Sequence, residues 1–252
     1  MEGEKPDIPR SINQWKREVK IYQAFGVDVL QIQPTKGCQD QVYVANVAMA
    51  IKPFIILANY KAPGRACEIP PAKKFFESMG YHCIQPPYVW EGEAETKQLR
   101  NNIYFGGYGK FTDIRAYQWL ADKTGISVIP VREIKDEMYH LDTGLFVLDE
   151  TNVLITEAAF DKKSLDRIAQ AANITFTPKG IETTGITNGV SIPDKKIYCS
   201  GTFFPEEKDY RKAMEFLLTT MDKFGYSTVF IDVDTYAVSG GALSCSVMHL
   251  TF

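Results

Sequence analysis

The strongest constraint on the fold is a pattern that recurs five times along the chain. In each copy, a segment with helical spacing of apolar residues ends at a glycine or asparagine, and a short alternating strand follows. The stop residues lie about 50 residues apart, a period typical of repeat architectures; they are Gly26, Gly80, Gly125, Asn173 and Gly225. Glycine or asparagine at the end of a helix is typical of a left-handed C-cap.

This pattern predicts an α/β protein, and two architectures are compatible with it. An ordinary open α/β sheet also alternates helix and strand. Five units at so regular a period favour a closed cyclic array, with helices outside and strands toward a common centre. Further strand-like pieces at 103–105, 145–148 and 196–199 lie between the repeats. Because no linker or low-complexity segment divides the chain, we expect one domain over residues 1–252.

The charge and composition of the chain limit the kinds of partner that it could bind. The formal net charge is −3, which argues against the basic face that nucleic-acid binding requires. The polar start of the chain does not resemble a signal peptide, and no apolar stretch is long enough to span a membrane. We therefore expect a cytoplasmic protein that binds a small molecule, and a homodimer is left open.

The spacing of the cysteines and histidines does not match that of metal ligands. The five cysteines are odd in number, widely spaced and without a CxxC pair. This predicts free thiols in a reducing compartment, with neither a disulfide framework nor a zinc site. The three histidines are not at metal-ligand spacing from one another, so no metal and no cofactor are expected.

Cys245 is a candidate nucleophile. It follows Gly240-Gly241 near the end of an expected strand, and glycines there leave the thiol little covered. A thiol becomes reactive when a cationic or acid/base partner lowers its pKa or takes its proton. The alternative is a buried structural cysteine, the commonest fate of a free cysteine.

His140 and Asp142 form an HxD triplet that suits acid/base chemistry. Alternation along a strand would place both on one face, about 6–7 Å apart. The carboxylate could then orient the imidazole or bind a cation beside it. The alternative is a hydrogen-bonded core histidine. His82 and His249 are both expected to be structural.

The segment from Glu91 to Glu95 places three carboxylates around a glycine. A guanidinium ion is planar and is best bound by carboxylates in a bidentate manner. Glu91 together with Asp142 would suit such a cation. The alternative is a solvated acidic loop.

Taken together and in this order, the clusters resemble the guanidino-group-modifying enzyme superfamily. The superfamily includes dimethylargininases, arginine deiminases, glycine amidinotransferases and arginine dihydrolases. The resemblance spans nearly the whole chain, through Gln14-Trp15, residues 40–46, Arg65, residues 90–95, 107–109 and 112–113, residues 139–143, and residues 239–245. It implies a five-bladed αβ-propeller of ββαβ-type repeats, with the active site on the central axis.

The resemblance also implies a mechanism on a guanidino or ureido substrate. Cys245 attacks the central guanidinium carbon, whose charge Glu91 and Asp142 hold. His140 protonates the departing ammonia or amine and then activates the water that releases a ureido product. In an amidinotransferase an acceptor amine would replace that water. A third possibility is a catalytically idle relative with a binding or regulatory role.

Several substrate contacts follow from the same resemblance, and some depart from the usual pattern. The implied substrate-binding residues are Asp142, Asn46, Arg65, Glu95 and Lys110. Many hydrolases of the superfamily have aspartate where this chain has Asn46, and the asparagine form resembles the arginine dihydrolases.

Other departures concern the substrate carboxylate and the start of the chain. Phe111 stands where an arginine usually binds that carboxylate, and Lys110, Arg115 or Arg65 could take over. In the EGxGD motif Ala94 and Glu95 replace the usual glycine and aspartate. Only about a dozen residues precede Gln14, so the N-terminal strand typical of the superfamily is expected to be largely missing.

Overall fold

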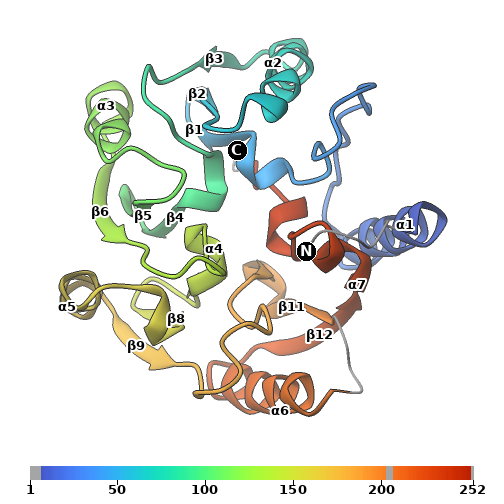
Figure 1. Cartoon of the computed structure of the whole chain (residues 1–252), viewed down its shortest axis with the longest axis vertical. Coiled ribbons are helices and arrows are strands. Elements are labelled where there is room, and N and C mark those ends of the chain that lie inside the picture. The colour runs from blue at the N-terminus through green and yellow to red at the C-terminus, as the bar shows by residue number, and fades with distance from the viewer. Residues whose placement is uncertain (1–6, 203–206, 251–252) are drawn as a thin grey trace. The chain divides into compact units, whose positions relative to one another are not determined.

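The computed structural model describes residues 7–202 and 207–250. The chain divides into two compact units, one made of Met1–Gln31 and Pro178–Leu243, the other of Ile32–Thr177 and Ser244–Phe252. In the described residues it forms four three-stranded sheets (Figure 1). The mixed α/β class expected from the sequence is confirmed.

The second unit contains three sheets of one design. In each, two antiparallel strands are followed by a helix and by a third strand that pairs in parallel with the second. A short turn can join antiparallel strands, whereas a parallel strand requires a crossover, which the helix provides. The strands are β1 (Ala48–Ile51), β2 (Phe54–Leu57), β3 (His82–Ile84), β4 (Thr96–Arg100), β5 (Ile103–Tyr108), β6 (Ser127–Arg132), β7 (Leu145–Val147), β8 (Asn152–Ile155) and β9 (Asn173–Phe176). The helices α2 (Ile69–Ser78), α3 (Arg115–Thr124) and α5 (Lys162–Ala171) each lie alongside the third strand of their own sheet (Figure 1).

The first unit repeats the design once. Its sheet consists of β10 (Gly189–Ile192), β11 (Ile197–Thr202) and β12 (Ser227–Asp232), with α6 (Lys208–Lys223) before the last strand. Two more helices, α1 (Ile8–Ala24) and α7 (Asp234–Val238), pack together. Gln14 on α1 donates to Asp234 at 2.7 Å and accepts from the Thr235 hydroxyl at 2.6 Å.

Four complete ββαβ units confirm the repeat within the described residues, but the first expected strand is wrong. Residues 27–32 form no strand, although their sequence alternates. An alternating segment becomes a strand only where a neighbouring strand completes its backbone hydrogen bonds. Leu30 is accordingly half exposed.

The expected helix caps are confirmed at the four glycines and wrong at the asparagine. Gly26, Gly80, Gly125 and Gly225 have φ values of 80°, 87°, 76° and 74°, in the left-handed region. Asn173 instead begins β9, because α5 already ends in the extended residue Ala172.

A shared core joins the second and third sheets of the second unit. Phe105 from β5 and Leu145 from β7 belong to one cluster of buried side chains, together with Leu141. Leu141 is fully buried, and such burial contributes about 1.5–3 kcal/mol. This core therefore anchors the segment that carries His140 and Asp142.

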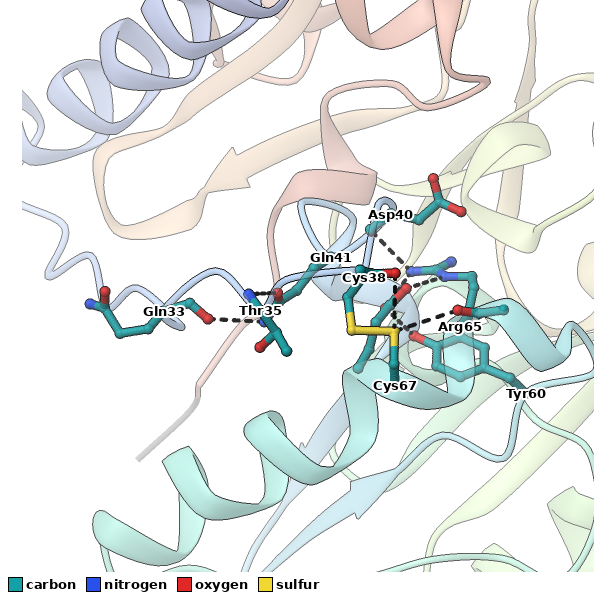
Figure 2. Close-up of a disulfide and its surroundings, with 11 residues drawn as sticks. Gln33, Thr35, Cys38, Asp40, Gln41, Tyr60, Arg65 and Cys67 are labelled. Atoms are coloured by element: carbon teal, nitrogen blue, oxygen red, sulfur yellow. Dashed lines mark hydrogen bonds and ion pairs between the residues drawn. A yellow bond between two sulfur atoms is a disulfide. The ribbon is translucent and has the colours of Figure 1, made fainter.

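One cysteine pair corrects the expectation of free thiols throughout. Cys38 and Cys67 form a disulfide, with their Cα atoms 5.8 Å apart (Figure 2). The two lie 29 residues apart in the sequence. Their separation in the sequence gives no sign that the loop before residue 44 packs against the turn that contains Arg65. Cys83, Cys199 and Cys245 are not in a disulfide.

None of the described helices has the length and apolar character to cross a membrane. The single-domain organisation, the cytoplasmic location, the lack of nucleic-acid binding and the open question of a homodimer remain predictions. The residues upstream of Asp7, where the missing N-terminal strand was considered, lie outside the described part of the chain.

Candidate active site

Four short turns of the second unit meet around the predicted site residues. They are η1 (Val44–Asn46), η3 (Gly92–Glu95), η6 (Ser244–Ser246) and the single-turn helix α4 (Leu141–Gly144). The turn η1 contacts both η3 and η6, and η3 contacts α4. Residues far apart in the sequence therefore come together, and the members of this buried cluster are Asn46, Glu91, Glu95, His140, Asp142 and Cys245.

His140 lies between an acid and an amide. Its Nε2 is 3.0 Å from Glu91 Oε2, and Asn46 Nδ2 is 3.3 Å from the same nitrogen. Burial lowers the pKa of His140, but the hydrogen bond with Glu91 and the charges of Glu95, Glu91 and Asp142 outweigh it. The net effect raises the pKa of His140, which favours the protonated imidazole, the form that can donate a proton.

Cys245 lies beside Asp142. Its Sγ is 3.8 Å from Asp142 Oδ2, and the hydroxyl of Ser244 donates to the same oxygen at 2.6 Å. Cys245 lies in the turn η6 and not, as the sequence predicted, near the end of a strand. The described residues that follow α7 form no strand. The thiol is buried but remains next to the carboxylate expected to hold a cation.

The expectation that His140 and Asp142 share one face of a strand is wrong. His140 is the extended N-cap residue of α4, and Asp142 lies in the first turn of that helix. The hydroxyl of Thr143 donates to the His140 carbonyl at 2.6 Å, which stabilises the turn. The two side chains consequently have different neighbours, His140 facing Glu91 and Asp142 facing η6.

Glu95 and Gly92 fix how η3 approaches its neighbours. Glu95 Oε2 accepts from the Leu141 backbone N–H at 3.2 Å, directly between His140 and Asp142. Gly92 has φ 63°, and a Cβ there would lie 2.5 Å from the Ala45 carbonyl oxygen. Glycine is required because η3 packs against the backbone of η1.

All three basic residues expected to replace the missing arginine are paired with a carboxylate. Arg65 binds Glu68, at 2.8 Å from Nε to Oε1, and donates to the Tyr43 carbonyl at 3.1 Å. Arg115 binds Asp113. Lys110 also pairs, with the exposed carboxylate of Asp136.

Lys110 differs from the other two because it lines a pocket. This open pocket of about 290 Å³ is bounded by Lys61, Lys110, Phe111, Asp136 and Tyr139. The Phe111 ring centroid is 5.3 Å from that of His140, so the pocket adjoins the buried cluster. Lys61 Nζ lies 5.6 Å above the Phe111 ring.

Four residues of this region were given no role from the sequence: Lys61, Glu133, Tyr139 and Ser244, the last two inside the quoted motifs. Tyr139 and Ser244 are direct neighbours of His140 and Cys245, which was an available signal. Lys61 and Glu133 belong to no motif. Among the described residues, no group of three or more His, Cys, Asp or Glu side chains could hold a metal ion.

Comparison with known proteins gives relatives of two kinds. The chain is 28% identical to N(G),N(G)-dimethylarginine dimethylaminohydrolase of Mycobacterium tuberculosis over 65% of its own length and 54% of that protein's. It is 24% identical to the bifunctional arginine dihydrolase/ornithine cyclodeaminase AgrE of Nostoc over its whole length, but over only 35% of AgrE. The chain thus spans about half of the first relative and about a third of the second.

Solved structures of the same two kinds of enzyme have a fold similar to that of this chain. The N-terminal domain of ArgZ, covalently bound to a reaction intermediate, superposes with a TM-score of 0.88 at 21% identity, over 98% of this chain and 88% of that one. A dimethylarginine dimethylaminohydrolase adduct superposes with a TM-score of 0.76 at 19% identity, over 96% and 92%. The chain is similar to these enzymes in sequence and in fold. The resemblance to the guanidino-group-modifying superfamily is confirmed, although no family model matches the chain.

Proposed function

We propose that this protein hydrolyses a guanidine or ureido C–N bond of an arginine-like small molecule through a covalent intermediate on Cys245. The observation that carries the proposal is the buried cluster in which Cys245 lies 3.8 Å from Asp142 while His140 lies 3.0 Å from Glu91. A nucleophile, an acid/base group and two carboxylates for a planar cation are thereby present within a few turns of chain.

Binding of the cation and activation of the thiol support each other. The carboxylate of Asp142 repels a thiolate at Cys245, since two like charges so close in a buried site destabilise each other. A guanidinium held by Asp142 and Glu91 offsets that repulsion. The nucleophile is therefore formed most readily when the substrate is in place.

The reaction proceeds in two halves. The thiolate of Cys245 adds to the guanidinium carbon, the C–N bond to the leaving amine breaks, and His140 gives that amine its proton. The product of this half is a thiouronium on Cys245. The neutral His140 then takes a proton from water, whose oxygen adds to the same carbon, and the C–S bond breaks to release the ureido product and the thiol.

Asn46 favours a reaction of the arginine dihydrolase type over that of a dimethylaminohydrolase. Its amide lies within hydrogen-bonding distance of both ring nitrogens of His140. An amide adds no negative charge there, whereas an aspartate would add a fourth carboxylate to Glu91, Glu95 and Asp142 around the imidazole. The relatives named arginine dihydrolase support this branch.

We also propose the finer architecture that the repeat indicates, a five-bladed αβ-propeller with the site on its central axis. Its support is the superposition of 98% of the chain on the ArgZ domain and the presence of four complete ββαβ units in the described residues.

A panel assay tests the function. Release of ammonia and of ureido products is measured with arginine, methylated arginines, agmatine, guanidino acids and citrulline. The proposal expects turnover of at least one compound and none by folded Cys245→Ser. Acceleration by an added amine, with transfer of the amidino group, would favour the amidinotransferase instead. Turnover that survives Cys245→Ser would refute the nucleophile.

A further inference from the structure

A buried pair of carboxyl groups lies behind the catalytic cluster. Glu95 is fully buried and Glu133, just after β6, is 3% exposed. Both reach the same point of β5, because a Cβ added at Gly107 would collide with Glu95 Oε2 and with Glu133 Oε1. Among the described residues, no N–H or O–H group donates to either oxygen of Glu133.

Two ionised carboxylates cannot occupy such a site together, so the pair holds a proton. Burial and then the charge of Glu95 raise the pKa of Glu133 well above its ordinary value. The pKa of Glu95 is raised as well, because burial outweighs the charge of His140 and the hydrogen bonds with Glu133 and the Leu141 N–H, but it is raised less than that of Glu133. The proton therefore belongs on Glu133, and Glu95 accepts it as a hydrogen bond.

We propose that Glu133 is a positioning residue: as a neutral carboxylic acid it donates to Glu95, keeps Glu95 ionised, and so maintains the positive charge of His140. Glu95 transmits the effect in two ways. Its Oε2 holds the Leu141 backbone N–H at 3.2 Å, and its negative charge stabilises the imidazolium of His140. The catalytic consequence rests on the proposed function, but the effect on the charge of His140 does not.

The other groups that face the pair are the same in every variant below. Glu91 and Asp142 face His140, and the charges of Asp142 and Lys110 reach Glu133. The hydroxyl of Tyr117 on α3 shares its one hydrogen between two backbone carbonyls, those of Glu95 at 2.9 Å and Gly107 at 2.5 Å. Burial raises the pKa of Tyr117, so it stays neutral.

The test is an NMR titration of His140 in variants of Glu133. The chain has only three histidines, so its imidazole signals are few, and His140→Asn assigns the relevant one. Glu133→Gln keeps a donor for Glu95, whereas Glu133→Leu removes it. Glu137→Gln is the matched control, an exposed glutamate in the same segment.

We expect the titration midpoint of His140 to be unchanged in Glu133→Gln and Glu137→Gln. In Glu133→Leu, Glu95 takes up a proton and its charge is lost, so the midpoint should fall by about one pH unit. An unchanged midpoint in Glu133→Leu overturns the proposal, and so does an equal fall in Glu133→Gln.

A second variant covers the case in which Glu133→Leu does not fold. Glu95→Gln removes the same charge at nearly the same volume, and the His140 midpoint should fall there too; no fall overturns the proposal.

Kinetics give the catalytic readout. The alkaline limb of kcat/KM should move to lower pH in Glu133→Leu and stay in place in Glu133→Gln. If the unchanged protein turned over no guanidine or ureido compound, the proposed function would fail, while the NMR titration would still decide the role of Glu133.

Discussion

Two histidine–glutamate pairs lie in the second unit, and their acids are two residues apart in the sequence. His140 pairs with Glu91 at 3.0 Å and His249 pairs with Glu93 at 2.6 Å. The first pair is buried, with side chains 7% and 3% exposed, whereas the His249 side chain is 47% exposed. Distance alone would therefore rank the pairs in the wrong order for chemistry.

The surroundings of the two pairs explain the difference. Glu93 also accepts from the His249 backbone N–H at 2.8 Å, and Met248 and Leu250 pack against the core of the first sheet. The His249–Glu93 pair therefore holds residues 248–250 against η3. His140 instead borders Asn46, Phe111 and the turn η3, where a bound cation would lie. A charged histidine becomes a catalytic candidate only when its neighbours are placed to act on a substrate.

Replacing the two histidines should separate the pairs most strongly. His140→Asn removes the acid/base group, and we expect kcat/KM to fall roughly 10²–10⁴-fold. His249→Asn leaves the cluster intact and should change kcat/KM less than about threefold, because an exposed ion pair contributes little energy. Steady-state kinetics on both variants make the comparison. Comparable losses in both would show that the pairs are not functionally distinct.

Replacing the two acids should give a smaller contrast. Glu91→Gln removes a charged hydrogen bond to His140, so the pKa of His140 should fall and kcat/KM drop roughly 10–100-fold. Glu93→Gln should cost about 0.2–1 kcal/mol of unfolding free energy and leave kcat/KM nearly unchanged. Urea denaturation and kinetics measure the two effects. A large kinetic loss in Glu93→Gln would contradict the assignment.

The pH dependence of stability should show the smallest effect. The charge of Glu93 raises the pKa of His249, so the stability from this group is fully present below its unfolded pKa of about 6.5 and is lost as pH rises through the folded pKa. The pKa of Glu93 is lowered, because the charge and hydrogen bonds of His249 outweigh burial, so its contribution is lost as pH falls below about 4.3.

The stability difference between the unchanged protein and His249→Asn should consequently be greatest between these limits. We expect this difference in unfolding free energy to be largest at about pH 5.5, where it should be under about 1 kcal/mol, and to vanish at alkaline pH. Urea denaturation across the pH range measures it. A difference that grew with rising pH would mean that His249 is held neutral.

Much of the fold could be predicted from the sequence, because local sequence patterns indicate local structure. Four glycine caps and the repeated order of helix, stop and strand follow from apolar periodicity and backbone conformation, whereas the ββαβ form of each unit was implied by the family resemblance. The segment 27–32 has the pattern of a strand, but strand formation depends on a partner that no local pattern contains. The cap at Asn173 failed for a related reason, since the chain entered β9 directly.

The site was only partly predictable. The ordered motifs bring Glu91, His140, Asp142 and Cys245 together, yet their mutual geometry depends on turns that the sequence did not reveal. Glu133 directly follows the strand β6 and resembles a surface residue in the sequence, but in the structure it lies at Gly107 together with Glu95. Cys38 and Cys67 pair only because two loops distant in sequence pack side by side.

The most direct test of the central claim compares the three cysteines outside the disulfide within the folded protein. A haloacetamidine carries the planar cation that Asp142 and Glu91 should hold, whereas a haloacetamide is neutral and of similar size. After brief treatment with each, peptide mass spectrometry measures the labelling of Cys83, Cys199 and Cys245. The account predicts that the amidine labels Cys245 first and that Asp142→Asn abolishes this preference. Equal labelling of Cys83 and Cys245 by the amidine would contradict it.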